Sequence, residues 1–174
     1  MLIYDIIISR ELILVLSRRD NMKLTTLCYI DKDDSYLMLY RNKKEQDQSK
    51  GKWLGIGGKL EEGESPEDCV LREVYEETGL KLNSFTSRGV ITFISDIWDD
   101  ELMFMFTATD FEGDITEKCN EGELAWIKKS EIMDLNLWEG DRYFLQDLID
   151  GKPLVNMKLT YEGDKLVSCE KYYD

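Results

Sequence analysis

Gly58–Leu80 reads GKLEEGESPEDCVLREVYEETGL, and this stretch determines how the rest of the chain is interpreted. Its second half is expected to form a helix. Ser65 is a favourable N-cap, and Asp68, three residues later, resembles a capping-box partner. Pro66 suits the first helical position, where its missing N–H costs nothing. Gly79 suits the left-handed residue that ends a helix. The sequence therefore predicts a helix that begins after Ser65 and ends at Gly79.

This helix is expected to have one acidic face and one packing face. At about 100° per residue, Glu73, Glu76 and Glu77 share one side. Three carboxylates this close repel one another, so a fold tolerates them best where a cation binds. An ordinary solvated acidic face would give the same E-x-x-E-E pattern, but here it follows GIGGK, a glycine turn whose backbone can approach a ligand closely. The residues expected to pack against a sheet are Leu71, Val74, Tyr75 and Thr78.

The whole string resembles a known signature, the Nudix box, which marks hydrolases that cleave a nucleoside diphosphate linked to another group. The fixed positions are matched by Gly58, Glu64, Arg72, Glu73, Glu76, Glu77 and Gly79, with Val74 and Leu80 at the aliphatic positions. The resemblance implies the Nudix fold, an α/β/α sandwich around a mixed β-sheet. Periodicity alone indicates only a single α+β domain.

The clustered carboxylates also indicate a metal site. Carboxylate oxygens suit a hard divalent cation, either Mg²⁺ or Mn²⁺. The chain contains no histidine, so a histidine base or metal ligand is excluded. By resemblance to the family, the box ligands are Glu73, Glu76 and Glu77 together with the carbonyl of Gly57. Glu77 or Glu76 would also orient or deprotonate water.

Further roles follow from the same resemblance. Arg72 would hold the box carboxylates in place, and Glu64 would pair with Arg72 rather than with metal. A further glutamate usually comes from a loop outside the box. The candidates are Glu121 and Glu123 in CNEGELAW, with Glu121 favoured. Either one could equally be an ordinary solvated loop carboxylate.

Composition limits the partners. The chain has 174 residues, 43% hydrophobic and 33% charged, which fits one globular domain. Its net charge of −14 argues against binding to a nucleic-acid polymer, which needs basic patches. A free nucleotide is not excluded, because a bound metal inverts the local charge. The sequence indicates neither a membrane segment nor an obligate protein partner.

The cysteines and the first residues add two expectations. Cys28, Cys69, Cys119 and Cys169 are scattered without a C-x-x-C, which favours reduced thiols in a cytoplasmic protein. Residues 1–21 are apolar in part, but Asp5, Arg10 and Glu11 interrupt them, so they fall short of a membrane helix. Without a basic start or a clear cleavage site, a signal peptide is not indicated. We expect an extension of unknown role ahead of a domain at 22–174.

Short apolar and alternating runs predict the remaining elements. A helix is expected at Asp141–Ile149, ending at Gly151 before Pro153, and Asn42–Lys50 is a polar loop. The expected strands are Leu24–Ile30, Tyr36–Tyr40, Trp53–Ile56, Val90–Ser95, Leu102–Thr109 and Glu123–Ile127, followed by a hairpin of Leu154–Tyr161 and Lys165–Tyr172.

Outside the box, LNLWEGDRYFLQDLIDGKP and the closing strands resemble the oxidised-purine branch of the MutT group. Enzymes of that branch hydrolyse 8-oxo-dGTP to its monophosphate and release diphosphate. The resemblance begins near Met22 and includes TTLCYI, LYRNKK, GKWLGIGGK and NEGELAW. It implies that Trp138 stacks on a purine and that Asp141 accepts hydrogen bonds from its N–H groups. A core aromatic and a helix N-cap are the plainer alternatives for these two residues. Arg41 and Lys59 are further candidates for substrate contacts, although Arg41 could be a solvated strand-end arginine.

Two departures separate the chain from the mammalian members of that branch. They carry an asparagine after the tryptophan of the strand entering the box, where this chain has Leu54. They also carry adjacent aspartates where this chain has Gly140 and Asp141. Recognition of the 8-oxo group must therefore differ or be looser. Two other functions stay open: a Nudix hydrolase of another diphosphate, such as a dinucleoside polyphosphate or nucleotide sugar, and a Nudix sensor that binds a nucleotide without cleaving it.

Overall fold

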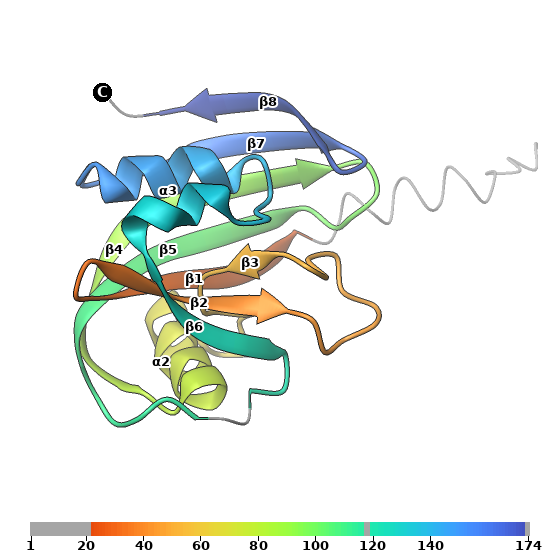
Figure 1. The fold of residues 1–174 in the computed structure, drawn as a ribbon. Coiled ribbons are helices and arrows are strands. Elements are labelled where there is room, and N and C mark those ends of the chain that lie inside the picture. Colours follow the sequence, from red (N-terminus) through yellow and green to blue (C-terminus); the bar gives the residue numbers. More distant parts are fainter. Residues whose placement is uncertain (1–21, 117–118, 173–174) are drawn as a thin grey trace, which may run out of the picture.

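A computed structural model describes residues 22–116 and 119–172 (Figure 1). The extension expected at residues 1–21 lies outside the described residues. Within them, no helix is both long and apolar enough to cross a membrane. The strands are β1 (Lys23–Lys32), β2 (Ser35–Arg41), β3 (Trp53–Leu54), β4 (Lys81–Ser95), β5 (Glu101–Glu112), β6 (Gly122–Lys128), β7 (Met157–Glu162) and β8 (Lys165–Lys171). The helices are α2 (Pro66–Thr78) and α3 (Asp141–Ile149), with a 3₁₀ helix, η1 (Lys129–Asp134).

The strands of the described residues form one mixed sheet. Its order is β3-β2-β1-β5-β4-β7-β8. The eighth strand, β6, pairs with β2, which also pairs with β3. The pairs β1–β5 and β4–β7 are parallel, and the other pairs are antiparallel. In β1 and β5, Lys23 lies opposite Glu101 and Thr25 opposite Met103, which sets which side chains meet on each face.

A helix covers each face of this sheet, because alternate residues of a strand point to opposite sides. In β1, Leu27 and Tyr29 join a core with α3, whereas Cys28 and Ile30 join a second core with α2. Figure 1 shows α3 and α2 on opposite sides of the strands. The α/β/α sandwich and the mixed sheet are therefore confirmed.

Helix α2 begins and ends where the sequence predicts. Ser65 and Asp68 form a reciprocal capping box, and Gly79 ends the helix with φ +78°. The expected packing face is partly wrong. Val74 and Thr78 are buried, but Leu71 and Tyr75 are exposed by 40% and 62%. The helix is rotated relative to that expectation, and its buried residues are Cys69, Val70, Val74, Glu77 and Thr78.

The turn between β3 and α2 is fixed against β1. The amide of Thr26 donates to the carbonyl of Gly58 (2.9 Å), and Cys28 and Ile56 exchange two hydrogen bonds (2.7 and 2.9 Å). A Cβ on Gly57 would overlap the carbonyl of Thr26, and a Cβ on Gly58 would overlap the carboxylate of Glu73. At position 57 the obstacle is the sheet backbone, so glycine is required there, and the turn brings its backbone against both the sheet and α2.

Several strand boundaries differ from the prediction. β4 begins at Lys81 rather than at residue 90, and its register with β5 shifts three times between Leu82 and Gly89. β3 ends at Leu54, and β7 begins at Met157 rather than at residue 154. η1 was not predicted. The helix expected at Asp141–Ile149 has the predicted boundaries.

Candidate active site

Arg72 organises the carboxylates that precede and line α2. It pairs with both oxygens of Glu64 (2.6 and 2.8 Å), and this contact lowers the pKa of Glu64 to about 2. It also donates to Glu73 (2.7 Å), to Glu76 (3.2 Å) and to the carbonyl of Lys59 (3.2 Å). The predicted pairing of Glu64 with Arg72 is present, and Arg72 contacts two of the three candidate box ligands.

Glu77 differs from its neighbours because its carboxylate is buried, with 5% of the residue exposed. Its Oε2 accepts a hydrogen bond from the amide of Gly57 (3.2 Å). Its Oε1 is buried without any hydrogen-bond partner in the described part of the chain. Burial, together with the charges of Glu121 and Glu73, raises the pKa of Glu77 to about 8. Burial of a carboxylate with so few hydrogen bonds is unfavourable unless a cation lies beside it.

The loop before β6 brings Glu121 next to this helix. Glu121 pairs with Arg41 of β2 and with Lys44, and its charge contributes to the raised pKa values of Glu77 and Glu73. Glu123 is exposed and instead accepts from the amide of Asn42 (2.7 Å). Of the two candidate loop glutamates, Glu121 is therefore the one that lies near Glu77.

The acidic residues beside the glycine turn repel one another, and a bound cation would relieve this repulsion. Among residues 22–116 and 119–172, no group of three or more aspartate, glutamate or cysteine side chains is arranged closely enough to hold a metal ion. Arg72 pairs with Glu73 and Glu76, while Arg41 pairs with Glu121. The Oε1 of Glu77 has no hydrogen-bond partner among the described residues. That oxygen and its acidic neighbours form a donor set that suits Mg²⁺ or Mn²⁺.

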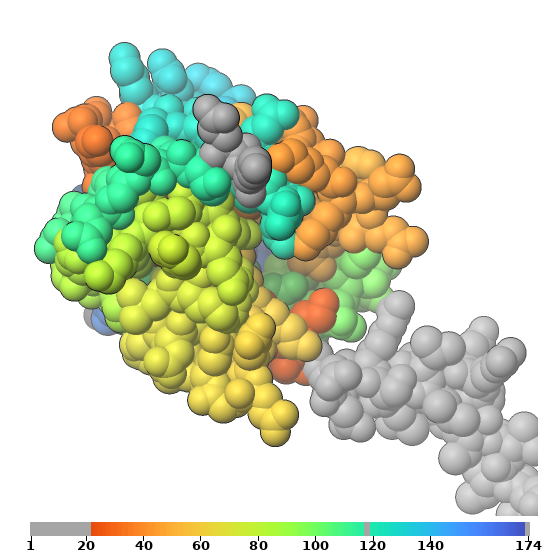
Figure 2. Space-filling model, turned by 90° about the horizontal axis from the view of Figure 1, so that it is seen from below, coloured from red at the N-terminus to blue at the C-terminus, as the bar shows by residue number. Residues whose placement is uncertain are grey.

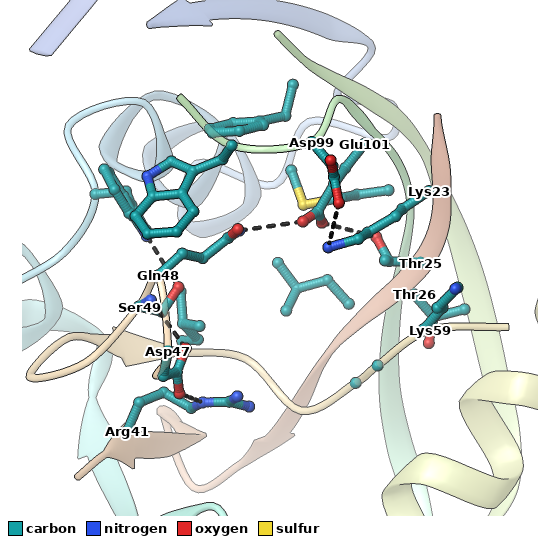
Figure 3. Close-up of a pocket in the computed structure, with 18 of the residues that line it drawn as sticks. Lys23, Thr25, Thr26, Arg41, Asp47, Gln48, Ser49, Lys59, Asp99 and Glu101 are labelled. Atoms are coloured by element: carbon teal, nitrogen blue, oxygen red, sulfur yellow. Dashed lines mark hydrogen bonds and ion pairs between the residues drawn. The ribbon is translucent and has the colours of Figure 1, made fainter. Parts of the chain in front are cut away.

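A cavity of about 850 Å³ opens beside the glycine turn, on the α3 side of the sheet (Figure 3). Gly57, Gly58 and Lys59 line one part of it together with Arg41, and Trp138 lines another. Its size is in the range of sites for small organic ligands. Figure 2 shows the other face, where α2 covers the sheet and segment 42–52 (orange) stands beside it. The turn is therefore shared by the acidic cluster and the cavity.

Trp138 belongs both to the core and to the cavity wall. It is 6% exposed, and its indole N–H donates to the hydroxyl of Ser49 (3.0 Å). Phe93 and Tyr161 contact it edge to face, with ring centres 6.4 and 5.4 Å away. The ammonium group of Lys52 lies 4.5 Å from its ring centre. The two roles left open for this residue are thus compatible.

Asp141 lies at the start of α3 and also lines the cavity. The N-cap position is Gly140, and no side chain caps this helix, so the N-cap alternative for Asp141 is wrong. Burial raises the pKa of Asp141 to about 7, although the charges of Lys52 and Arg142 oppose this rise. Its carboxyl group therefore keeps its proton to a higher pH than an ordinary aspartate does.

Segment 42–52 contributes contacts that the sequence did not reveal. Asp47 accepts from Arg41 (2.7 Å) through one oxygen and from the amide of Ser49 (2.9 Å) through the other. Ser49 also accepts from Trp138, so a chain of contacts joins Arg41 to Trp138. Figure 3 shows Arg41, Asp47 and Ser49 side by side. The only signal in the sequence was the Asp-x-Ser spacing, which favours such a turn.

The comparisons with known proteins agree with this geometry. Residues 22–148 match the NUDIX domain family. An uncharacterized Nudix hydrolase, YvcI, of Bacillus subtilis is 33% identical over 144 residues, covering 80% of this chain and 87% of that protein. The oxidized purine nucleoside triphosphate hydrolase of Mus musculus is 34% identical over 120 residues, covering 68% of this chain and 76% of the relative.

A solved structure is similar over most of its length. The crystal structure of the MutT protein of Bacillus halodurans has a TM-score of 0.78 and 29% identity, covering 86% of this chain and 97% of that one. The family match covers more than half of the chain, and it includes both the glycine turn and the acidic helix. The chain therefore belongs to the Nudix hydrolase family and has relatives of the MutT type.

Proposed function

We propose that this protein is a metal-dependent nucleoside triphosphate pyrophosphohydrolase that acts on oxidised purine nucleotides. Its preferred substrate would be 8-oxo-dGTP, which it would convert to 8-oxo-dGMP and diphosphate, sanitising the nucleotide pool. The observation that carries the proposal is the cavity of about 850 Å³, which extends from Trp138 and Asp141 to the glycine turn. One ligand can then place a base at Trp138 and its phosphates beside Glu77.

The acidic cluster would hold the metal. We assign Glu73, Glu76, Glu77 and Glu121, with the carbonyl of Gly57, as the residues that would bind Mg²⁺ or Mn²⁺. When bound, such an ion neutralises phosphate oxygens and lowers the pKa of a bound water. The buried, unpartnered Oε1 of Glu77 supports this assignment, because an adjacent cation would remove the cost of its burial.

The protein's own side chains would position the reacting groups. Arg72 holds Glu73 and Glu76 in place on α2. Arg41 and Lys59 line the cavity beside the turn and would contact the phosphates. Glu77 or Glu76 would accept the proton from the attacking water. Glu77 is anchored for this role by the amide of Gly57, which donates to its Oε2 (3.2 Å).

The base would be recognised on the other side of the turn. Trp138 would stack on the purine, and Asp141 would hydrogen-bond its edge. With a pKa of about 7, the carboxyl group of Asp141 can either accept or donate near neutral pH. Leu54 lines the same cavity without a polar group, so Asp141 would carry more of the recognition. The name of the relative from Mus musculus supports this choice of substrate.

The decisive experiment is a hydrolysis panel with saturating Mg²⁺. It compares 8-oxo-dGTP with dGTP, a dinucleoside polyphosphate and a nucleotide sugar, and each reaction is repeated with a chelator. We expect the highest kcat/KM for 8-oxo-dGTP, the monophosphate and diphosphate as products, and no turnover without metal. A clear preference for one of the other two compounds would move the assignment to another Nudix hydrolase. Binding without hydrolysis of any of them would indicate a sensor.

A further inference from the structure

A second acidic group lies in the cavity, on the wall formed by β1 and β5. Glu101 is half-buried at the start of β5 and lines the cavity. Its Oε1 accepts from the side-chain amide of Gln48 (3.1 Å), and its Oε2 accepts from the hydroxyl of Thr25 (3.4 Å). Figure 3 shows Gln48 reaching from segment 42–52 toward Glu101 on the opposite wall. The carboxylate is thus held in a defined orientation inside the cavity.

The surroundings of Glu101 are unfavourable for a charge that serves no ligand. The next cavity residue along the same face of β5 is Met103, and Phe93 lines the cavity as well. Burial raises the pKa of Glu101, although the amide of Gln48 and the charge of Lys23 oppose this rise. A carboxylate in a site for an anionic ligand also repels that ligand. This repulsion is tolerable where the carboxylate accepts a hydrogen bond from the ligand.

The position of Glu101 restricts which part of a nucleotide it can meet. Phosphates are anionic acceptors, and the cationic residues Arg41 and Lys59 line the cavity beside the glycine turn. An ionised carboxylate only accepts hydrogen bonds, so it cannot bind a phosphate oxygen. The donor groups of a nucleotide are its sugar hydroxyls and the N–H groups of its base. Two hydrogen bonds leave part of the acceptor capacity of Glu101 unused, since a carboxylate offers about four acceptor positions.

We propose that Glu101 is a specificity-determining residue that accepts a hydrogen bond from a donor of the nucleoside, either a sugar hydroxyl or the amino group of the base. Gln48 and Thr25 hold its oxygens toward the cavity. This role is separate from that of Asp141, which belongs to α3, and it supplies a polar contact in a cavity where Leu54 supplies none. The proposal rests on the proposed function, because it takes a nucleotide as the ligand of the same cavity.

The test pairs substitutions of Glu101 in the protein with single-group changes in the substrate. Glu101→Gln weakens the acceptor, and Glu101→Leu removes it. Glu112→Gln is the matched control, because Glu112 lies at the other end of β5, exposed and paired with Lys81. Each protein is assayed with dGTP, with 2′,3′-dideoxy-GTP, which lacks only the 3′-hydroxyl, and with dITP, which lacks only the 2-amino group. Thermal unfolding monitors the fold of each variant.

A hydrogen bond to a charged acceptor contributes a preference of roughly ten-fold or more. We therefore expect wild type to favour dGTP over one of the two analogues by about this factor. The same ratio should shrink stepwise toward one in Glu101→Gln and Glu101→Leu, and it should be unchanged in Glu112→Gln. The analogue whose ratio changes in the Glu101 variants identifies the sugar or the base as the partner of Glu101. If Glu101→Gln is folded and keeps both ratios, Glu101 does not contact the nucleoside.

Failure of the proposed function has a different signature. If wild type hydrolyses neither these nucleotides nor 8-oxo-dGTP, the proposed activity is wrong, and the same ratios are measured as Kd values by calorimetry. A loss of discrimination in Kd on substitution of Glu101 would then still support its role in binding. Absence of both binding and hydrolysis would overturn the two proposals together.

Discussion

Glu77 places a carboxyl group where the fold provides only one hydrogen-bond donor for it within the described residues. Its Oε2 accepts from Gly57, and its Oε1 has no partner within the described residues. A neutral amide would fit the same position without the cost of burying a charge. Stability and activity should therefore respond to its substitution in opposite ways.

We predict that Glu76→Gln and Glu77→Gln fold normally but lose roughly a hundred-fold or more in kcat, the scale expected for loss of a catalytic base. The amide keeps the shape and removes the charge that would hold a cation. For Glu77→Gln the melting temperature should be equal to or higher than that of wild type. Glu67→Gln, in the exposed first turn of α2, is the control. Wild-type turnover in both variants at saturating Mg²⁺ would contradict the assignment.

Asp141 gives the fold a pH dependence of defined sign. Its pKa is raised from 3.8 to about 7, so the folded state binds its proton more tightly than the unfolded state does. The stabilisation is complete below about pH 4 and is lost as pH rises toward 7, by up to about 4 kcal/mol. We predict that Asp141→Asn flattens this part of the stability curve. Urea unfolding of both proteins across this range measures it, and parallel curves would argue against a raised pKa.

Trp138 combines packing with a position on the cavity wall, so the choice of substitution matters. Trp138→Ala would lose core packing worth about 3–5 kcal/mol, which would obscure any effect on substrate. Trp138→Phe retains an aromatic ring but gives up the hydrogen bond to Ser49 and part of the stacking area. We predict that it raises KM for 8-oxo-dGTP about two- to five-fold, because phenylalanine keeps only part of a stacking contact that contributes about 1–3 kcal/mol per base. An unchanged KM with an intact fold would place the base elsewhere.

At the scale of elements, segment 42–52 positions groups that belong to different strands. The side chain of Asp47 is 6% exposed and pairs with Arg41 of β2, while its second oxygen orders the turn at Ser49. Ser49 in turn accepts from Trp138. The segment therefore links the cationic part of the cavity to its aromatic part.

We predict that Asp47→Asn raises KM for nucleoside triphosphates roughly five- to ten-fold, with a smaller change in kcat, because one charge-assisted hydrogen bond to Arg41 is weakened. The asparagine can still order the turn through its carbonyl oxygen, so the melting temperature should change little. Asp33→Asn, in the exposed turn between β1 and β2, is the control. A large fall in kcat at constant KM would assign Asp47 a different role.

Local signals explain which elements could be predicted. The ends of α2 follow from Ser65 and Gly79, whose effects act within a few residues. The first half of β4 could not be found, because its residues are largely polar and bulges break their alternation. The burial predicted for Leu71 and Tyr75 was wrong, because the rotation of α2 about its axis depends on the contacts of the glycine turn with β1 and α2. That contact joins distant parts of the chain.

The same distinction applies to the site. The box residues lie within one helix and its preceding turn, so spacing was enough to bring them together. The cavity instead collects side chains from segment 42–52, β4, β5 and the residues around the start of α3. Asp47 and Glu101 could not be recognised as cavity residues, because only the sheet order brings β5 and segment 42–52 together. Arg41 was predicted as a candidate, but its pairing with Asp47 was not.

At the scale of the whole molecule, the described fold begins with β1 at Lys23. The sequence pattern of the domain also begins close to Met22. We predict that deletion of residues 1–21 leaves kcat/KM and the melting temperature nearly unchanged. Activity assays and thermal unfolding of the two proteins provide the comparison. A large loss of stability in the shortened protein would show that the apolar residues of this segment belong to the core.

The glycine turn has a consequence for how proteins of this design can diversify. It is the boundary where the cavity on one face of the sheet meets an acidic helix on the other, and a Cβ at Gly57 would collide with the backbone of Thr26. Under the proposed function, selectivity and turnover would be encoded by separate sets of residues. A library that randomises the cavity walls but leaves the turn and α2 untouched should yield altered nucleotide preferences with hydrolysis retained. Gene duplicates could take the same route to new substrates.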